Sequence, residues 1–308
     1  MSYDRIFLGL SLTTLLQEPG PNDLIIDFWE GGSSLYGWDH MGSCVDRLPI
    51  YVTNPECIER LGGTPQELDS ESELIGEYRD YLRKFSLDVA ELPQWFREPL
   101  SKVYIPREGW CQLFRTMISG VRSERKFGEI IWIDLNSSAI KMSQWGLVRF
   151  RELFNTFPLE YLVRKIKGCS PGEASRNFPF EPLYVSVFIV KGREEKFRTY
   201  LLGKRKFFSV AVVKVPMPHD GDYSLMYSII PYTDYKAVGG FRQKAYSDLK
   251  RLGVSVDKIV FERSYFEKYG VLGKASFPEC LKMGNVVLSG RLGEWREKGI
   301  CDITSGFG

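Results

Sequence analysis

Apolar and polar positions in the first 30 residues follow the order strand, helix, strand. The run YDRIFLGL has the length and apolar character of a short buried strand. The next residues, SLTTLLQ, predict about two helical turns, which the prolines and the glycine of EPGPND end. LIIDFW is then a second apolar strand. These elements form a βαβ unit, whose strands are expected to be parallel, and such a unit is typical of a doubly wound α/β domain.

The stretch from Pro65 to Pro99 has a different pattern. In SESELIGEYRDYLRKF, apolar residues recur at helical spacing with charged residues between them, which predicts a small helical insertion. Residues 101–142 then predict a turn, an amphipathic helix and a strand. LVRFRELFNTFPLEYLVRKI predicts a strand that leads into another short helix.

Residues from about 180 to 233 predict an antiparallel sheet. Glycines, prolines and charged turns separate four apolar or alternating runs, which are PLYVSVFIVKG, KFRTYLLG, KFFSVAVVKVP and YSLMYSIIPY. GGFRQKAYSDLKRLGV predicts an amphipathic helix that Gly253 closes. NVVLSGRLGEWREKG predicts a last strand followed by a glycine turn.

Composition and charge exclude several classes of protein. The chain has 308 residues with 44% hydrophobic and 26% charged residues, which is typical of one large or two ordinary globular domains. Its apolar runs are too short to span a bilayer, and its amino end lacks the pattern of a signal peptide, so we expect a cytoplasmic protein. The net charge of +2 does not favour nucleic acid as a partner. The basic run GKRKFF at 203–208 is interpreted as a short charged hairpin.

Cysteine and histidine spacing argues against a metal site. The six cysteines form no Cys-x-x-Cys pair, and the two histidines, His40 and His219, are in turn-like segments. We expect mostly buried free thiols. One internal disulfide is the alternative if the source is a hyperthermophile. A Ser-His-Asp hydrolase would need a nucleophile elbow such as Gly-x-Ser-x-Gly, which the sequence lacks. No catalytic side chain is predicted.

The turn after the first strand has part of the pattern of a dinucleotide-binding loop. In such a loop the first glycine permits the turn, the second lets the pyrophosphate approach the backbone, and the third lets the helix pack on the strand. Gly9 keeps the first role, whereas Ser11 and Thr14 take the second and third positions. Both hydroxyls can bond to phosphate, but both side chains add bulk. A buried strand and helix without a ligand is the alternative.

An acidic residue and a glycine pair follow the second strand. Asp27 stands where a carboxylate would accept hydrogen bonds from a ribose hydroxyl, and Glu30 is a second candidate. A solvated carboxylate at a strand end is the alternative. Gly31 and Gly32 come next and permit another close approach to the backbone.

The order of these segments resembles the opening of the amine-oxidase-like FAD proteins, which include protoporphyrinogen oxidase, the flavin amine oxidases and UDP-galactopyranose mutase. In that group a dinucleotide loop, an acidic strand end, a Gly-Gly turn and a Gly-x-x-x-Asp segment follow one another. Gly42 and Asp46 match the last of these in GSCVD. Three later segments also resemble parts of the group, namely VYIPREGWCQLFRTMISGV, EIIWIDLNSSAI and LFNTFPLEYL.

NVVLSGRLGEWREKGICDITSGFG resembles the carboxyl-terminal flavin motif of the group. The resemblance implies that Gly290 and Gly293 turn backbone N–H groups toward the cofactor. It also implies that Arg291 offsets negative charge near the flavin or the phosphates, that Trp295 lies near the flavin, and that Asp302 reaches the ribityl or phosphate region. A surface ion pair for Arg291 and core packing for Trp295 are the alternatives.

The resemblance implies an α/β fold with two domains. The first is a discontinuous Rossmann-like FAD-binding domain formed by residues 1–60, 101–180 and 271–308. The second is a substrate-type domain with an antiparallel sheet and helices, formed by residues 61–100 and 181–270. A cofactor cleft is expected where the domains join.

The function implied is that of an FAD-dependent oxidoreductase acting on a small organic substrate. A sugar-nucleotide isomerase similar to UDP-galactopyranose mutase is one alternative. A cofactor-free partner or regulatory protein that keeps the fold is another. Tyr265 and Tyr269 either line the substrate face or are core residues at helical spacing. The sequence leaves open whether the chain forms homo- or hetero-oligomers.

Overall fold

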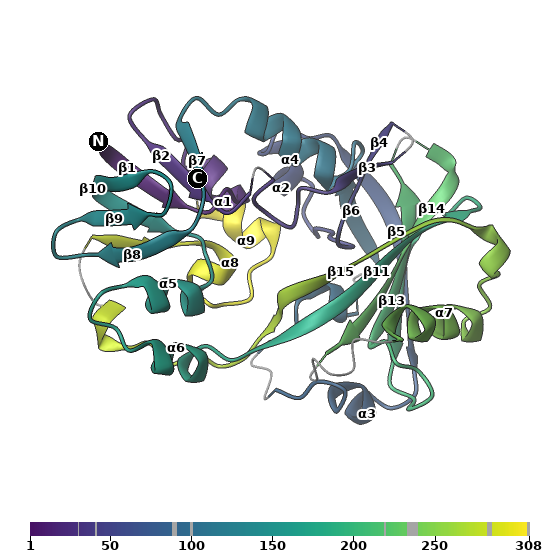
Figure 1. Cartoon of the computed structure of the whole chain (residues 1–308). Coiled ribbons are helices and arrows are strands. Elements are labelled where there is room, and N and C mark those ends of the chain that lie inside the picture. Colours follow the sequence, from purple (N-terminus) through teal and green to yellow (C-terminus); the bar gives the residue numbers. More distant parts are fainter. Residues whose placement is uncertain are drawn as a thin grey trace. The chain divides into compact units, whose positions relative to one another are not determined.

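The chain forms two compact units, each built from separate stretches of sequence (Figure 1). The computed structural model describes residues 1–29, 31–40, 42–87, 91–98, 101–218, 220–232, 240–281 and 285–306, without the side chains of Pro171, Glu173 and Ser175. The first unit comprises Met1–Tyr36, Phe114–Pro179 and Lys274–Gly308, and the second comprises Gly37–Leu113 and Phe180–Gly273. This division differs from the predicted one because residues 37–60, 101–113, 180 and 271–273 fall in the second unit.

A mixed, mainly parallel sheet forms the centre of the first unit. Its strands follow the order β7-β2-β1-β10-β9-β8, and β16 pairs with β10. Pairings among β7, β2, β1, β10 and β16 are parallel, whereas β8, β9 and β10 form an antiparallel meander. The strands are β1 (Ser2–Leu8), β2 (Leu24–Asp27), β7 (Glu124–Phe127), β8 (Ile130–Asp134), β9 (Ala139–Met142), β10 (Gly146–Asn155) and β16 (Val286–Leu288).

Short helices follow several of these strands. The predicted βαβ unit is confirmed, because β1 and β2 are parallel and α1 connects them. Phe7 and Leu8 of β1, like Ile25 and Ile26 of β2, are at most 1% exposed, as expected for parallel strands covered on both faces. The helices that lie wholly in this unit are α1 (Leu12–Leu16), α5 (Leu159–Lys165), α6 (Pro171–Asn177), α8 (Gly290–Gly293) and α9 (Ile300–Ser305).

The second unit contains a sheet in the order β15-β11-β14-β13-β12-β5-β6. The antiparallel sheet predicted for residues 180–233 is confirmed in β11–β14, and the predicted helix α7 packs on β14 and β11 (Figure 1). The strands are β3 (Trp38–His40), β4 (Ser43–Val45), β5 (Pro65–Ile75), β6 (Lys102–Pro106), β11 (Phe180–Lys191), β12 (Phe197–Leu202), β13 (Ala211–Met217), β14 (Asp220–Pro231) and β15 (Ile259–Leu272). The helices are α2 (Glu56–Glu59), α3 (Tyr78–Leu82) and α7 (Phe241–Arg251), while α4 (Trp110–Ser119) crosses the division between the units.

One prediction of helix in this unit is confirmed only in part, and another is wrong. Residues 65–75 form the strand β5, which pairs in parallel with β12 and antiparallel with β6, and α3 covers only Tyr78–Leu82. Tyr265 and Tyr269 lie in the strand β15, which pairs with β11, and not in a helix. In both segments, pairing with a neighbouring strand overrides a local apolar spacing that is compatible with a helix.

The prediction of free thiols is also wrong. Cys44 and Cys111 form a disulfide within the second unit, and Cys169 and Cys280 form one within the first. In the described part of the chain, no cysteine is free. Disulfides of this kind are typical of proteins from oxidising compartments or of intracellular proteins from hyperthermophiles.

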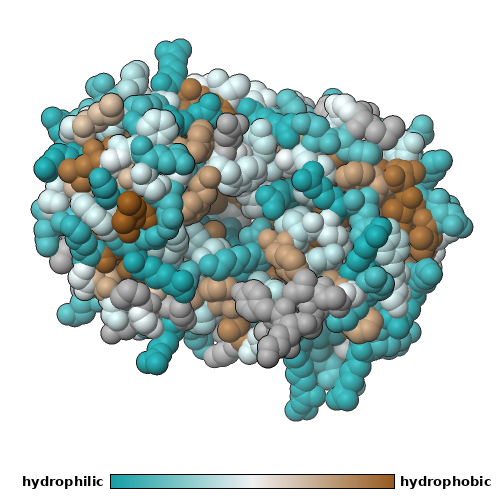
Figure 2. Space-filling view, viewed as in Figure 1, coloured by the Kyte–Doolittle hydropathy of each residue, from teal (hydrophilic) through white to brown (hydrophobic). Residues whose placement is uncertain are grey.

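The surface is mostly polar in the view of Figure 2, where hydrophobic residues gather only in small groups. Among the described helices, none combines the length and the apolar character that a membrane crossing needs.

Candidate functional site

Gly9 forms the turn between β1 and α1, at the carboxyl end of the parallel strands. Its φ is +101°, and its N–H donates to the Ile26 carbonyl over 2.9 Å. A Cβ at this position would lie 2.5 Å from Thr156 Oγ1 and 3.1 Å from the Phe157 ring. Only glycine combines this backbone conformation with so close a neighbour, so the turn is built as a dinucleotide loop requires.

Ser11 and Thr14 take the second and third glycine positions of the loop pattern, and their hydroxyl groups bond to backbone groups of the same loop. Ser11 is the N-cap of α1 and accepts the Thr14 N–H over 3.2 Å. The Thr14 hydroxyl is fully buried and donates to the Gly9 carbonyl over 2.6 Å. Because the Thr14 side chain points into the protein, only Ser11 of the two residues is placed where a phosphate could meet it.

The Asp27 carboxylate ties the end of β2 to this loop. It is 5% exposed, and it accepts the N–H of Leu10 over 2.5 Å and that of Phe28 over 2.6 Å. Burial raises the pKa of Asp27, while these backbone N–H groups act in the opposite direction. Asp27 therefore has a structural role that the sequence did not indicate, beside the predicted one at a ribose. Glu30, the second candidate, lies outside the described residues.

Of the Gly31–Gly32 pair, Gly32 packs on the same loop. A Cβ on Gly32 would overlap the carbonyl oxygen and the side chain of Leu10, and one on Gly31 would overlap the Trp29 ring. Gly32 is therefore required for the close approach of this turn to the Gly9 loop.

Three aromatic rings lie beside the loop, and sequence reasoning missed them. Phe28 stacks on Phe157 with ring centroids 4.7 Å apart, and Tyr161 packs edge-on against both rings. The Phe28 side chain is 46% exposed, although most large apolar residues of this unit are buried. The only sequence signal was an aromatic residue directly after the acidic strand end. The cluster gives the loop a flat apolar neighbour of the kind on which a nucleotide base can stack.

The carboxyl-terminal motif packs against α1 and the end of β10. Gly290 has a φ of +76°, and a Cβ there would lie 2.7 Å from Thr13 Oγ1. A Cβ on Gly293 would overlap the carbonyl oxygen of Asn155 and would lie 3.1 Å from the Cα of Thr156, the residue that Gly9 also faces. The structure therefore brings together the two glycine motifs, which are about 280 residues apart in the sequence.

Other predicted side chains of this motif bond within the motif itself. Arg291 forms a bidentate ion pair with Glu297, in which Nε donates to Oε2 over 2.7 Å and Nη2 donates to Oε1 over 2.8 Å. The Arg291 side chain is only 18% exposed. Asp302 accepts the Gly299 N–H over 2.8 Å and so caps α9, a helix that the sequence analysis did not predict. Both residues thus have structural partners, and the predicted contacts with a cofactor stay predictions.

Trp295 has an unusual backbone conformation. Its φ is +53°, which is rare for an aromatic residue and carries strain that packing must offset. Its ring is 5% exposed and packs on Phe178 at 5.3 Å. This is the packing role that the sequence left open as the alternative.

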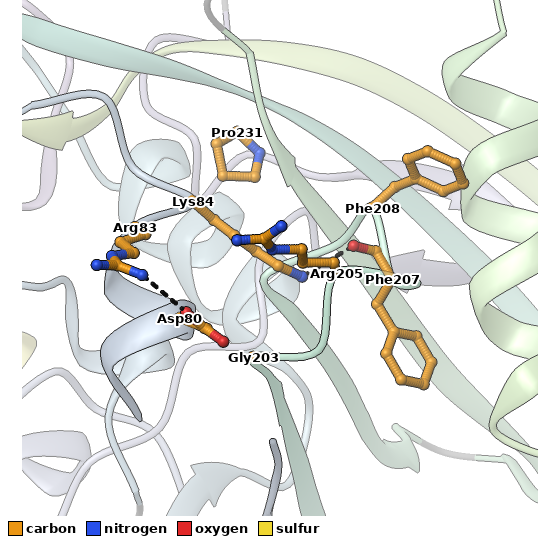
Figure 3. A pocket seen from close by; sticks show the side chains of 8 residues that line it. All are labelled: Asp80, Arg83, Lys84, Gly203, Arg205, Phe207, Phe208 and Pro231. Carbon is orange, nitrogen blue, oxygen red and sulfur yellow. Dashed lines mark hydrogen bonds and ion pairs between the residues drawn. The ribbon is translucent and has the colours of Figure 1, made fainter. Parts of the chain in front are cut away.

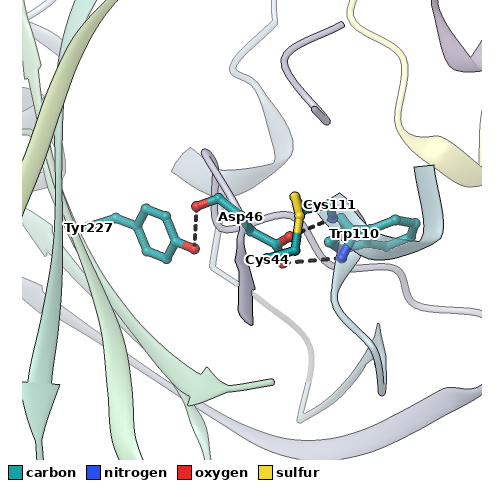
Figure 4. The surroundings of a disulfide bond; sticks show 5 residues. All are labelled: Cys44, Asp46, Trp110, Cys111 and Tyr227. Carbon is teal, nitrogen blue, oxygen red and sulfur yellow. Dashed lines mark hydrogen bonds between the residues drawn. A yellow bond between two sulfur atoms is a disulfide. The ribbon is translucent and has the colours of Figure 1, made fainter. Parts of the chain in front are cut away.

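Gly42 and Asp46 lie in the second unit. Gly42 has a φ of +80° in the turn between β3 and β4. Asp46 caps the start of α4 by accepting the N–H groups of Trp110 and Cys111 over 3.2 and 2.6 Å, next to the Cys44–Cys111 disulfide (Figure 4). Tyr227 donates its hydroxyl to the Asp46 carbonyl. The Gly-x-x-x-Asp segment thus fixes the beginning of a helix.

Burial of Asp46 predicts a pH-dependent stability. Desolvation raises the pKa of Asp46 from 3.8 to about 6. Between these values only the folded state holds the proton, so the free energy of unfolding should fall by up to about 3 kcal/mol as the pH rises from about 4 to above 6. Asp46→Asn removes this titration. Urea unfolding of both proteins from pH 4 to 7 should show the wild type losing stability relative to the variant, and a constant difference would contradict the assignment.

The described residues hold no cluster of three or more histidine, cysteine or acidic side chains that could bind a metal ion. His40 lies at the end of the strand β3, and its ring packs on Phe261 with centroids 3.9 Å apart and a tilt of 32°. His219 is outside the described residues.

No protein-family profile and no curated protein sequence matches the chain. Solved structures do match it. Reduced UDP-galactopyranose mutase is 13% identical with a TM-score of 0.69, over 99% of this chain and 92% of the mutase. The CLA-producing fatty acid isomerase from P. acnes is 11% identical with a TM-score of 0.68, over 99% and 97% of the two chains. A triple mutant of putrescine oxidase is 12% identical with a TM-score of 0.63, over 99% and 98%.

These three proteins are members of the FAD amine-oxidase-like superfamily. The predicted fold class, a Rossmann-like domain plus a second domain with an antiparallel sheet, is confirmed. The chain has the fold of the amine-oxidase-like flavoproteins.

Proposed function

We propose that the chain binds FAD and acts as an oxidoreductase on a small organic substrate. The observation that carries the proposal is the packing of the Gly290–Gly293 motif against α1, directly after the Gly9 turn. In α/β sheets, ligands bind at the carboxyl ends of the parallel strands, which is where these two motifs meet. The likeness to solved flavoproteins supports the fold, and the cofactor and the reaction are inferred from it.

The residues at this edge of the sheet are suited to an adenine dinucleotide, except that one side chain obstructs the pyrophosphate. The Gly9 turn would admit a phosphate to the backbone, Asp27 would accept a hydroxyl through its remaining lone pairs, and Phe28 would support the base. The obstacle is the Ser11 side chain, which stands where a second glycine would leave space for the pyrophosphate. A bound flavin would supply the hydride acceptor, while the chain would orient it and exclude water.

The visible spectrum of the purified protein is the first test. Absorbance bands near about 375 and 450 nm, with flavin released by heating, would support the proposal. A colourless protein that gains no such bands on addition of FAD would overturn it. That result would support the cofactor-free partner or regulatory protein, for which the internal ion pair of Arg291 and the buried hydroxyl of Thr14 already argue.

Ser11→Gly should tighten FAD binding about tenfold, because it opens space beside the pyrophosphate. The loss of the N-cap should cost only a few tenths of a kcal/mol with glycine. Ser11→Ala is the matched control, since it removes the hydroxyl but keeps the Cβ, and it should bind FAD no more tightly than the wild type. Fluorescence titration with FAD measures both. Equal affinity in all three proteins would remove this loop from the site.

One cluster in the second unit favours the sugar-nucleotide isomerase as the second candidate. Arg47 lies 4.3 Å from the Tyr265 ring centroid, and Arg263 lies 4.9 Å from that of Trp38. Tyr265 also donates to the Arg47 carbonyl over 2.5 Å. Arginines held by aromatic rings are suited to a diphosphate. Conversion of UDP-galactopyranose by the reduced, FAD-loaded protein would establish this activity. If no conversion is measured, the oxidoreductase is the one enzymatic function still proposed.

The cytoplasmic location and the state of assembly stay predictions. Disulfides such as Cys44–Cys111 and Cys169–Cys280 agree with a cytoplasmic location only if the source is a hyperthermophile.

A further inference from the structure

The basic run at 203–208 connects β12 to β13 and forms one wall of a pocket in the second unit (Figure 3). The C-terminal part of α3 and the residues after it form the facing wall. The pocket has a volume of about 460 Å³ and is lined by Asp80, Arg83, Lys84, Gly203, Arg205, Phe207, Phe208 and Pro231. Three of these side chains are cationic and one is acidic, and that acid already pairs with Arg83 at 3.3 Å. The lining therefore carries an excess of positive charge.

Buried groups hold the basic loop in place. The N–H groups of Gly203 and Lys204 both donate to the Ile75 carbonyl over 3.0 Å. At the other end of the loop, the fully buried Asp248 carboxylate accepts the N–H groups of Phe208 and Ser209 over 2.9 and 2.6 Å. Anchors at both ends mean that little loop entropy is lost when a ligand binds.

Lys84 connects the two walls. Its ammonium group donates to the carbonyls of Phe207 and Ser209 over 2.9 and 2.8 Å. An ammonium has three N–H donors, so these two carbonyls leave one for a ligand. Burial lowers the pKa of Lys84 to about 8, and an anion beside it would offset this desolvation. Lys84 is thus a positioned cation, unlike a freely moving surface lysine.

The rest of the lining is apolar. Pro231 contributes an apolar surface, and Phe208 is 44% accessible, with the cationic groups of Lys244 and Arg251 lying 5.4 and 5.8 Å from its ring centroid (Figure 3). The Arg205 side chain is exposed. The pocket therefore combines an anion-binding set of Arg83, Lys84 and Arg205 with a surface on which a ring can pack.

We propose that this pocket binds a small organic phosphate. Arg205 and Lys84 bind the doubly charged phosphate group, Arg83 adds positive charge, and Phe208 and Pro231 contact an apolar or aromatic body. The site is separate from the glycine motifs of the first unit and does not depend on FAD binding.

Calorimetric titration with phenyl phosphate and with inorganic phosphate tests the proposal. Arg205→Gln should weaken binding of both compounds at least about tenfold, because the charge-assisted contact is lost. Phe208→Ala should weaken phenyl phosphate about fivefold and leave inorganic phosphate unchanged, because the ring contacts only the organic part.

Lys206→Gln is the matched control, since Lys206 is an exposed cation of the same run outside the pocket lining. It should change the affinity less than about twofold. Circular dichroism verifies that all variants fold. The proposal is overturned if the wild type binds neither compound up to about 10 mM, or if Arg205→Gln and Lys206→Gln weaken binding equally.

Discussion

Replacing both Cys169 and Cys280 by alanine should lower the free energy of unfolding by about 4–5 kcal/mol. The two cysteines are 111 residues apart in the sequence, and their disulfide closes a long loop within the first unit. In the chain-entropy description, a disulfide that closes a loop of this length removes much of the freedom of the unfolded state. Urea unfolding of the double variant and of the wild type measures the difference.

A control separates the covalent link from the side chains. A variant with the single change Cys280→Ala should lose about as much stability as the double variant, because one missing partner already breaks the link. Equal midpoints of unfolding for the wild type and the double variant would show that the bond contributes nothing to stability.

Gly293→Ala should destabilise the protein by about 3 kcal/mol and should also abolish any FAD binding. Its Cβ would overlap the carbonyl oxygen of Asn155, and a backbone atom at the end of β10 cannot move aside as a flexible side chain can. The displaced motif would no longer pack beside α1. Thermal unfolding and FAD titration measure the two effects.

Gly172→Ala is the matched control in the same unit. Among the described side chains, a Cβ there would meet Ser170 Oγ alone, at 3.9 Å, and alanine is the better helix former, so the variant should keep or slightly raise the stability. If Gly293→Ala is as stable as Gly172→Ala, the close packing of the carboxyl-terminal motif is incorrect.

The parts of the fold that can be predicted from sequence are those where local pattern and tertiary setting agree. The strands β1 and β2 are continuous apolar runs because both of their faces are covered. The local pattern around the strand β5 favours a helix, because Leu74 has apolar neighbours at helical spacing. The strand forms instead because it pairs with β12 and β6, whose residues lie elsewhere in the sequence.

The sequence predicts the place of the candidate site in the fold better than it predicts the contacts of the individual side chains. Glycine positions show where backbones approach, and Gly9 and Gly290 do lie at the same edge of the sheet. The sequence left an ion pair open for Arg291, and one forms with Glu297 of the same motif. Sequence could not show that Asp27 accepts the loop N–H of Leu10, because this contact depends on how the two segments pack. The stacking of Phe28 on Phe157 was missed for the same reason.

The Cys169–Cys280 disulfide lies a few residues before β16 and the carboxyl-terminal motif. A covalent anchor at this place ties the last segment of the chain to the stretch Phe114–Pro179 of the same unit, whether or not a nucleotide is present. The carboxyl-terminal motif is therefore covalently anchored within its unit independently of any ligand.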